Sequence, residues 1–134
     1  MRSEQPSHQV VLEATAATER TMRPQRVPVN VYETSGALVV LAPMPAVTAE
    51  DITVELRPDP RTLRFWAHVR SAPPRTYLVH EWEYGGYERE VEVPEGYGAA
   101  LEASLANGQL AIRVLAGPPQ GAITLTPTAL ERAH

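Results

Sequence analysis

The sequence predicts an all-β fold, an antiparallel β-sandwich flanked by flexible N- and C-terminal extensions. Roughly seven short strand-like segments follow one another between residues 26 and 115, bounded by turn residues such as Pro, Gly, Asn and Asp. No convincing helical pattern separates them, which argues against parallel βαβ units. We therefore expect an N-terminal arm at 1–26, the β domain at 27–116 and a C-terminal extension at 117–134.

The segment Leu101–Val114 predicts a two-residue hairpin. Its centre is Asn107-Gly108, and both central positions of such a turn need positive φ, which Asn tolerates and Gly adopts freely. A shift of the register by one residue would move Glu102 and Arg113 into the core, so the pairing is strongly specified. The expected pairs, all on one face, are Leu105 with Leu110, Ala103 with Ile112, and Leu101 with Val114.

Upstream of the hairpin, three more strands are predicted. Ala37–Ala42 is a continuous apolar run, as expected of a strand covered on both faces, and Pro43 ends it. Residues 52–57 alternate between apolar and polar, which predicts a half-buried strand. After a Pro-Asp-Pro turn, residues 63–70 show the same alternation. Residues 1–26 have few aromatics and only a thin helical stripe, so we expect that arm to be mostly disordered.

Charge and composition exclude several function classes. The net charge of −4 provides no polybasic surface for nucleic acid or an anionic membrane. All 12 basic residues are arginine, so the chain has neither a Gly-x-x-x-x-Gly-Lys phosphate loop nor a Schiff-base lysine. The absence of cysteine excludes disulfides and fits a reducing cytoplasm. No leader-like or membrane-spanning apolar run is visible, so we expect a cytoplasmic protein.

One cluster resembles a catalytic or metal site: His68, His80, Glu81 and Glu83. On a strand, His80 and Glu81 would face opposite ways, and no third nitrogen or sulfur ligand has the spacing of a zinc site. The sequence also lacks a Gly-x-Ser-x-Gly elbow. We therefore expect a protein that is not an enzyme, with no catalytic residues, no metal and no cofactor.

Arg89 lies on the face of its strand that is otherwise apolar. Residues 88, 90 and 92 are all glutamate and form the opposite face. A buried arginine needs a carboxylate or carbonyl partner, and an inward-facing charge also discourages unwanted strand addition. The alternative is that the side chain extends to solvent at the strand end. We favour a paired, interface-related role, with Glu81, Glu83 or a residue of another subunit as the partner.

Three motifs then carry a family resemblance. Residues 103–110, Ala-Ser-Leu-Ala-Asn-Gly-Gln-Leu, match an Ala-x-x-x-Asn-Gly-x-Leu signature. Residues 84–89, followed by Val93-Pro94, are similar to a Tyr-Gly-x-Phe-x-Arg…Leu-Pro segment, with Tyr87 in place of Phe. Residues 45–52 are similar to a Pro-Gly-Val-x-x-Glu-Asp-Ile turn, with Ala46 in place of Gly. In these motifs, over about ninety residues, the chain resembles the small heat-shock proteins, whose common unit is the α-crystallin domain.

The resemblance implies an immunoglobulin-like sandwich, a homodimer as building block that forms a higher oligomer, and ATP-independent holding of partly unfolded client proteins. It also implies a dimer edge near Arg89, Tyr87 and Glu81. Two features depart from the family pattern: the segment between Val69 and Glu81 is short for a strand exchanged between subunits, and the N-terminal arm lacks phenylalanines. The implied groove for clients or anchors is formed by Ile52, Val54, Leu56, Leu101, Ala103 and Leu105.

Beyond the domain, a Pro- and Gly-rich linker leads to Ile123-Thr124-Leu125, which is similar to the family's C-terminal Ile-x-Ile/Val/Leu anchor. Alternate side chains of an extended triplet can fill two pockets while its backbone extends a sheet. We expect this oligomerisation anchor to reach the groove of a neighbouring subunit. Pro127 should end the strand, and Thr128 could cap a last helical turn through Glu131.

Two function classes stay open at this point. The first is a general holdase of the small heat-shock type. The second is a dedicated protein-binding module, such as the co-chaperones with the related CS-domain sandwich, which recognise one folded partner and stay monomeric. The hairpin, the Arg89 segment and the Ile-x-Leu triplet favour the holdase, whereas the weak N-terminal arm favours the module.

Overall fold

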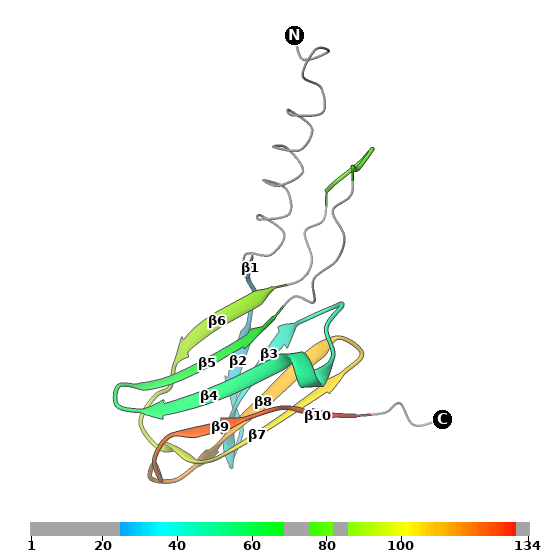
Figure 1. Cartoon of the computed structure of the whole chain (residues 1–134). Coiled ribbons are helices and arrows are strands. Elements are labelled where there is room, and N and C mark those ends of the chain that lie inside the picture. The colour runs from blue at the N-terminus through cyan, green and yellow to red at the C-terminus, as the bar shows by residue number, and fades with distance from the viewer. Residues whose placement is uncertain (1–24, 69–75, 82–85, 131–134) are drawn as a thin grey trace.

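The computed structural model describes residues 25–68, 76–81 and 86–130 and contains two five-stranded sheets that face each other (Figure 1). The first sheet has the strand order β1-β6-β5-β4-β9 and the second has the order β10-β7-β8-β3-β2. In the first sheet the strands are β1 (Gln25–Arg26), β6 (Tyr87–Glu92), β5 (Arg61–Ala67), β4 (Ile52–Pro58) and β9 (Ile123–Leu125). In the second they are β10 (Thr128–Ala129), β7 (Tyr97–Ala106), β8 (Gln109–Ala116), β3 (Ala37–Pro43) and β2 (Asn30–Glu33).

The predicted all-β sandwich is confirmed. Its central strands pair antiparallel, and the described residues contain only a short 3₁₀ turn, η1 (Ala49–Asp51), as helical structure. Parallel pairing occurs in two places, both at sheet ends: β1 with β6 and β10 with β7. No helix in the described part of the chain is long and apolar enough to cross a membrane.

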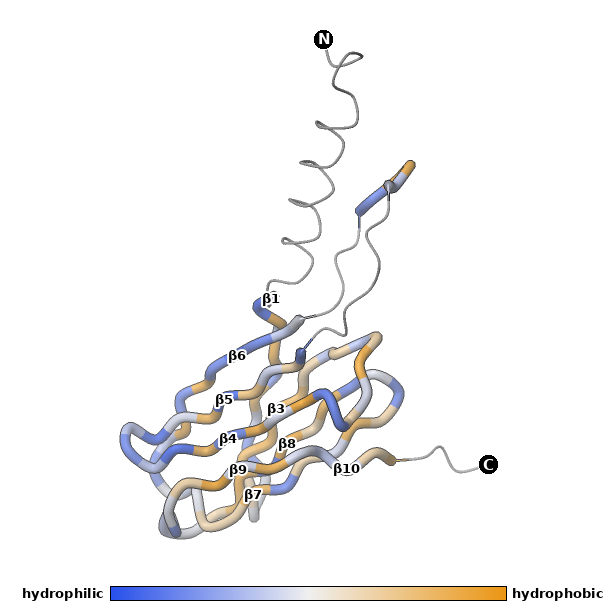
Figure 2. Tube along the Cα trace, in the orientation of Figure 1, coloured by the Kyte–Doolittle hydropathy of each residue, from blue (hydrophilic) through white to orange (hydrophobic). Residues whose placement is uncertain are grey.

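The core lies between the two sheets and is built by the predicted alternation. Phe65 and Leu63 of β5 and Ile52 of β4 point inward and are fully buried. Figure 2 shows the resulting alternation of apolar and polar positions along β4 and β5. In β3 residues of both alternate sets are buried, as the continuous apolar run predicted.

The β7–β8 hairpin has the predicted register. Leu105 pairs with Leu110, and the two pairs beyond it match the expectation. Asn107 and Gly108 have φ values of 53° and 76°, so both turn positions use the left-handed region that this turn requires. The side chains of Leu110, Ile112 and Val114 are fully buried, which fixes the inward face of β8.

The end of the chain differs from the prediction. Thr128–Ala129 does not begin a helical turn but forms β10, in parallel with Ser104 and Leu105 of β7. Strand β9 ends at Leu125, before Pro127, as predicted. A separate strand, β10, begins after the proline because the edge of β7 offers backbone partners, and the Leu130 N–H donates to the Leu105 carbonyl at 2.9 Å. The predicted arm at 1–26 lies almost wholly outside the described residues, and so does Glu83. Gln25–Arg26, at its end, form β1.

Candidate functional site at the sheet edges

Strands β4 and β7 lie close together on the side of the sandwich that β9 covers, and the six residues predicted to form an apolar groove (called the groove below) lie on these two strands. Ile52, Val54 and Leu56 of β4 all point inward and are fully buried, because they are alternate residues and therefore share one face of the strand. Leu101 and Leu105 of β7 are slightly more exposed, and Ala103 is partly buried against the same core. The six residues predicted to form the groove therefore belong to two facing strands of one domain.

The Ile-x-Leu triplet lies on this groove as strand β9. Leu56 pairs with Ile123 and Val54 with Leu125 in an antiparallel ladder. Both triplet side chains are partly buried against the core, whereas Thr124 between them is exposed. In this structure the segment comes from the same chain, as Figure 1 shows for β9 beside β4.

Arg89 finds a carbonyl partner within the chain. Its Nη1 donates to the carbonyl oxygen of Val27 at 2.9 Å, while its Nε is buried and has no partner among the described residues. The guanidinium borders an open cavity of about 300 Å³ between β1, β5 and β6. That cavity is lined by Arg26, Arg64, Glu88, Arg89 and Glu90.

The other two residues predicted at the dimer edge are placed differently. Tyr87 is only 4% exposed, and its hydroxyl donates to the Pro45 carbonyl at 2.7 Å, so its ring is part of the core. This follows from the inward face of β6, which Tyr87 shares with Val91. Glu81 is exposed on residues 76–81, which project away from the sandwich (Figure 1). It is therefore Val27, and not Glu81, that accepts the hydrogen bond from Arg89 Nη1.

The structure shows two exposed apolar surfaces that the sequence analysis did not identify. Tyr77, Leu78 and Val79 on the projecting segment are exposed, and Leu78 fully so. Strand β2 is the outermost strand of its sheet, and all its residues are exposed, including Val31 and Tyr32. The run Tyr-Leu-Val after a polar stretch was the available signal for the first surface, but its exposure depends on the path of the chain.

Solved structures match this architecture. A small heat-shock protein from Xylella fastidiosa, described as having a distinct high-order structure, aligns with a TM-score of 0.62 at 20% identity, over 84% of this chain and 100% of that one. The chain has the α-crystallin fold of the small heat-shock proteins. The hspA protein of Xanthomonas axonopodis aligns with a TM-score of 0.58 at 22% identity, over 72% of this chain and 99% of that one.

Heat shock protein 16.0 of Schizosaccharomyces pombe aligns on the same α-crystallin fold, with a TM-score of 0.58 at 20% identity, over 72% of this chain and 91% of that one. Comparison of the sequence with protein-family models and with curated proteins gave no match. The resemblance read from the three motifs is thus confirmed at the level of the fold.

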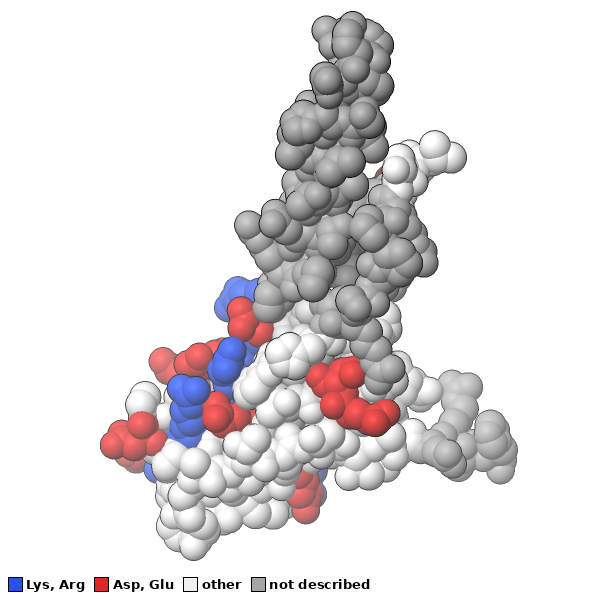
Figure 3. Space-filling view, in the orientation of Figure 1, with Lys and Arg blue, Asp and Glu red and all other residues white. Residues whose placement is uncertain are grey.

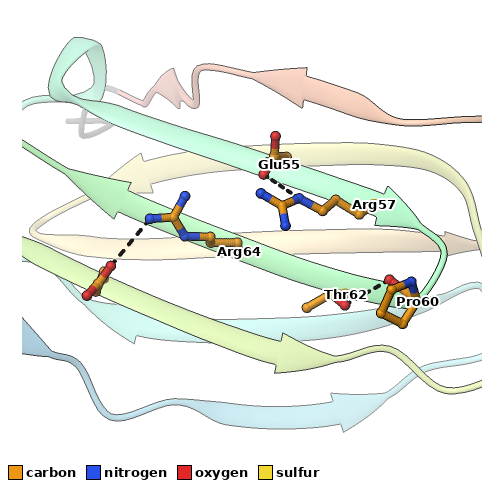
Figure 4. A network of polar contacts seen from close by, with 6 residues as sticks. Glu55, Arg57, Pro60, Thr62 and Arg64 are labelled. Atoms are coloured by element: carbon orange, nitrogen blue, oxygen red, sulfur yellow. Dashed lines mark hydrogen bonds and ion pairs between the residues drawn. The ribbon is translucent and has the colours of Figure 1, made fainter.

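The outer face of the first sheet of this α-crystallin fold carries paired charges. Arg64 lies 3.4 Å from a carboxylate oxygen of Glu88, and its guanidinium stacks over the Trp66 ring at 4.3 Å. Arg57 bonds Glu55 at 3.0 Å (Figure 4). Figure 3 shows charged side chains gathered over β4, β5 and β6, apart from the largely uncharged surface around β9. Exposed pairs of this kind contribute little to stability, so this face provides solvation.

The histidines of the α-crystallin fold do not assemble a metal site among the described residues. The ring of His80 stacks on Tyr77 with 4.2 Å between centroids, and its Nε2 is buried with no partner in that part of the chain. The backbone N–H of His68 donates to the Asp51 carbonyl. Within the described ranges, no group of three or more His, Asp or Glu side chains could hold a metal ion.

Proposed function

We propose that the protein is an ATP-independent holdase of the small heat-shock type, which binds partly unfolded proteins in the cytoplasm and prevents their aggregation. The observation that carries this proposal is the aliphatic groove of β4 and β7, covered by the three-residue strand β9. The α-crystallin fold, shared with several small heat-shock proteins, supports it. The proposal includes no enzymatic step and no cofactor.

The cover over the groove is weak enough to be replaced. Fully burying two branched aliphatic side chains is worth about 1.5–3 kcal/mol each, and both are only partly buried here. Ordering the linker and the strand costs about 1–2 kcal/mol per residue, which offsets much of this gain. An extended client segment with aliphatic residues two positions apart can pair with the edge of β4 in the same way. Heating therefore exposes the groove without nucleotide.

A homodimer as building block is supported by the two exposed apolar surfaces. Among the described residues no strand pairs with the outer edge of β2, which presents backbone groups together with Val31 and Tyr32. The segment with Tyr77, Leu78 and Val79 projects from the sandwich, and its exposed side chains can pack on such an edge of a second copy. Each copy has one donor segment and one acceptor edge, so the exchange closes as a symmetric dimer.

The test of the proposed function is aggregation of a heat-unfolded client, followed by light scattering without nucleotide. We expect suppression at near-stoichiometric ratios, and stronger suppression with Ile123→Ala/Leu125→Ala, because that variant uncovers the groove. Thr124→Ala is the matched control, since Thr124 is exposed between the two anchors and should change nothing. If the client aggregates at the same rate with and without the protein at every stable temperature, the holdase function is refuted.

The second candidate, a monomeric binding module, is favoured by one observation. Both the groove and Arg89 find their partners within a single chain. Solution mass with and without heating separates the two candidates. A dimer or larger assembly supports the holdase, and a monomer at all temperatures supports the module.

A further inference from the structure

The last described residues cover the edges of both sheets at once. Strand β9 extends the first sheet beside β4, and β10, only two residues later, extends the second sheet beside β7. Between them Pro127 is buried. Figure 1 shows the two strands as one extended segment along one side of the sandwich. An edge strand without a partner presents a row of free N–H and C=O groups, and this segment covers two such rows.

The linker before β9 is fitted to its own domain. Gly117 has a φ of 127°, its N–H donates to the Gly96 carbonyl at 2.9 Å, and a Cβ at this position would lie 2.9 Å from the Cβ of Ala99. Pro119 lies against Gly98, where a Cβ would be 3.3 Å from its Cγ. Close approach of this kind needs glycine on the chain that is approached. The linker thus turns back over β7 and delivers β9 and β10 to the edges of the same chain.

We propose that residues 117–130 form an intramolecular strap that closes both sheet edges as one unit, with the edge of β7 as a second strand-accepting site beside the β4 groove. Each strand alone is short and held weakly. When β9 is paired with β4, the two-residue connection keeps β10 close to the edge of β7, so the effective concentration of β10 at that edge is high. In the same way, pairing of β10 with β7 keeps β9 close to β4. Release of either strand therefore loosens the other. Only the idea that client segments replace the strap rests on the proposed function.

Disulfide trapping tests whether the strap closes within one chain. The native sequence has no cysteine, and Glu55 and Thr124 are directly paired on the outward face of β4 and β9. Opposite residues of antiparallel strands lie within the range that a disulfide bridges. Under mild oxidation, Glu55→Cys/Thr124→Cys should form a disulfide inside one chain. When the two single variants are mixed, little cross-linked dimer should form. Efficient cross-linking in the mixture would overturn the proposal, because the segment would then come from a neighbour.

Hydrogen exchange tests the coupling of the two edges. Leu130→Pro removes the N–H that bonds the Leu105 carbonyl, while Leu130→Ala keeps it and changes only an exposed side chain. Exchange of the β4 amides should be roughly fivefold to tenfold faster in Leu130→Pro, the effect of one lost net hydrogen bond, and unchanged in Leu130→Ala. Equal β4 protection in both variants would show that β10 does not help to hold β9.

A peptide copy of the strap tests the second site itself. A labelled peptide of residues 122–130 should bind Leu130→Pro about tenfold more tightly than a peptide of residues 122–127, which lacks β10. Equal affinities would mean that the edge of β7 accepts no strand. None of these measurements involves a client protein. A chain that traps the disulfide but fails to suppress aggregation would therefore refute the proposed function and leave the strap standing.

Discussion

At the scale of single residues, Arg89 shows how an inward-facing charge is accommodated in one chain. Its guanidinium donates to the carbonyl of Val27, a residue that is itself buried, and it borders a cavity open to solvent. It thereby ties the segment after β1 to β6. The partner, the Val27 carbonyl, is neutral, so a substitution of Arg89 leaves no isolated buried carboxylate behind. The substitution therefore removes only one charge-assisted hydrogen bond.

We expect Arg89→Ala to lower the free energy of unfolding by about 1.5–3 kcal/mol, the usual value of a hydrogen bond from a charged group. Chemical denaturation measures this change. Glu92→Ala is the matched control on the same strand, because Glu92 is exposed, and it should stay within about 0.5 kcal/mol of wild type. Equal stability of Arg89→Ala and Glu92→Ala would show that the guanidinium is simply solvated.

Among the described residues, Tyr97 makes a hydrogen bond that depends on pH. Its hydroxyl donates to a carboxylate oxygen of Glu33 at 2.6 Å. This hydrogen bond raises the pKa of Tyr97 above the ordinary tyrosine value, and desolvation and the nearby negative charge of Glu33 raise it further. The contact joins the start of β7 to β2, so it helps to hold the exposed edge strand.

Because the folded-state pKa is raised, the contribution of Tyr97 to stability is present below the unfolded pKa of about 10 and is lost as the pH rises through the folded pKa. The chain has 5 tyrosines. Subtracting the ultraviolet titration curve of Tyr97→Phe from that of the wild type leaves the titration of Tyr97 alone. Glu33→Gln should lower the pKa of Tyr97, because it removes the carboxylate charge that raises it. Identical titration curves for wild type and Glu33→Gln would exclude the effect of the carboxylate.

At the scale of elements, the β7–β8 hairpin depends on a backbone conformation. Gly108 has a φ of 76°, but a Cβ there would meet only the Cα of Pro45 at an ordinary 3.7 Å. Glycine is therefore favoured at position 108 by its left-handed backbone conformation, and not by a lack of space for a side chain. Gly108→Ala should cost about 1–2 kcal/mol of stability. Gly36→Ala, in a turn where a Cβ meets nothing within 4 Å, is the control and should be nearly neutral. Equal effects of the two substitutions would contradict this account.

The elements also divide into those that the sequence could predict and those that it could not. Strands β3, β4, β5 and β8 were predictable because each carries several apolar residues with a clear period, and the Asn-Gly turn fixed the register of one pair. Strand β10 was not, because two residues after a proline have no periodicity and become a strand only through the free edge of β7. β10 is a strand only because it pairs with β7, which is distant in the sequence.

The candidate site divides in the same way. The groove residues could be identified because inward positions of β4 and β7 follow from alternation, and the triplet could be matched to them by its own spacing. What the sequence could not specify is which chain supplies the triplet. That depends on the path of the linker over Gly98 and on the close approach at Gly117, and these contacts have no periodic signal.

At the scale of the whole molecule, the two sides of the sandwich differ. On one side β9 and β10 cover the edges of β4 and β7. On the opposite side the first sheet ends in the two-residue β1 and the second ends in the fully exposed β2. Under the proposed function, such a molecule assembles through the side of β1 and β2, while the groove on the other side stays covered by β9. Assembly and groove opening are then separate events.

This separation predicts that the dimer can be broken without opening the groove. Leu78→Ser/Val79→Ser removes two exposed aliphatic side chains from the projecting segment, so the core of each subunit should keep its stability. Loss of their burial against the β2 edge of a second copy costs about 3 kcal/mol or more, which weakens the dimer roughly a hundredfold. Sedimentation or native mass spectrometry should then report monomers at micromolar concentration. Leu130→Ser, another exposed leucine but on the covered side, should leave the mass unchanged. If Leu78→Ser/Val79→Ser keeps the wild-type mass, the projecting segment takes no part in assembly, and the open edge of β2 must be used in another way.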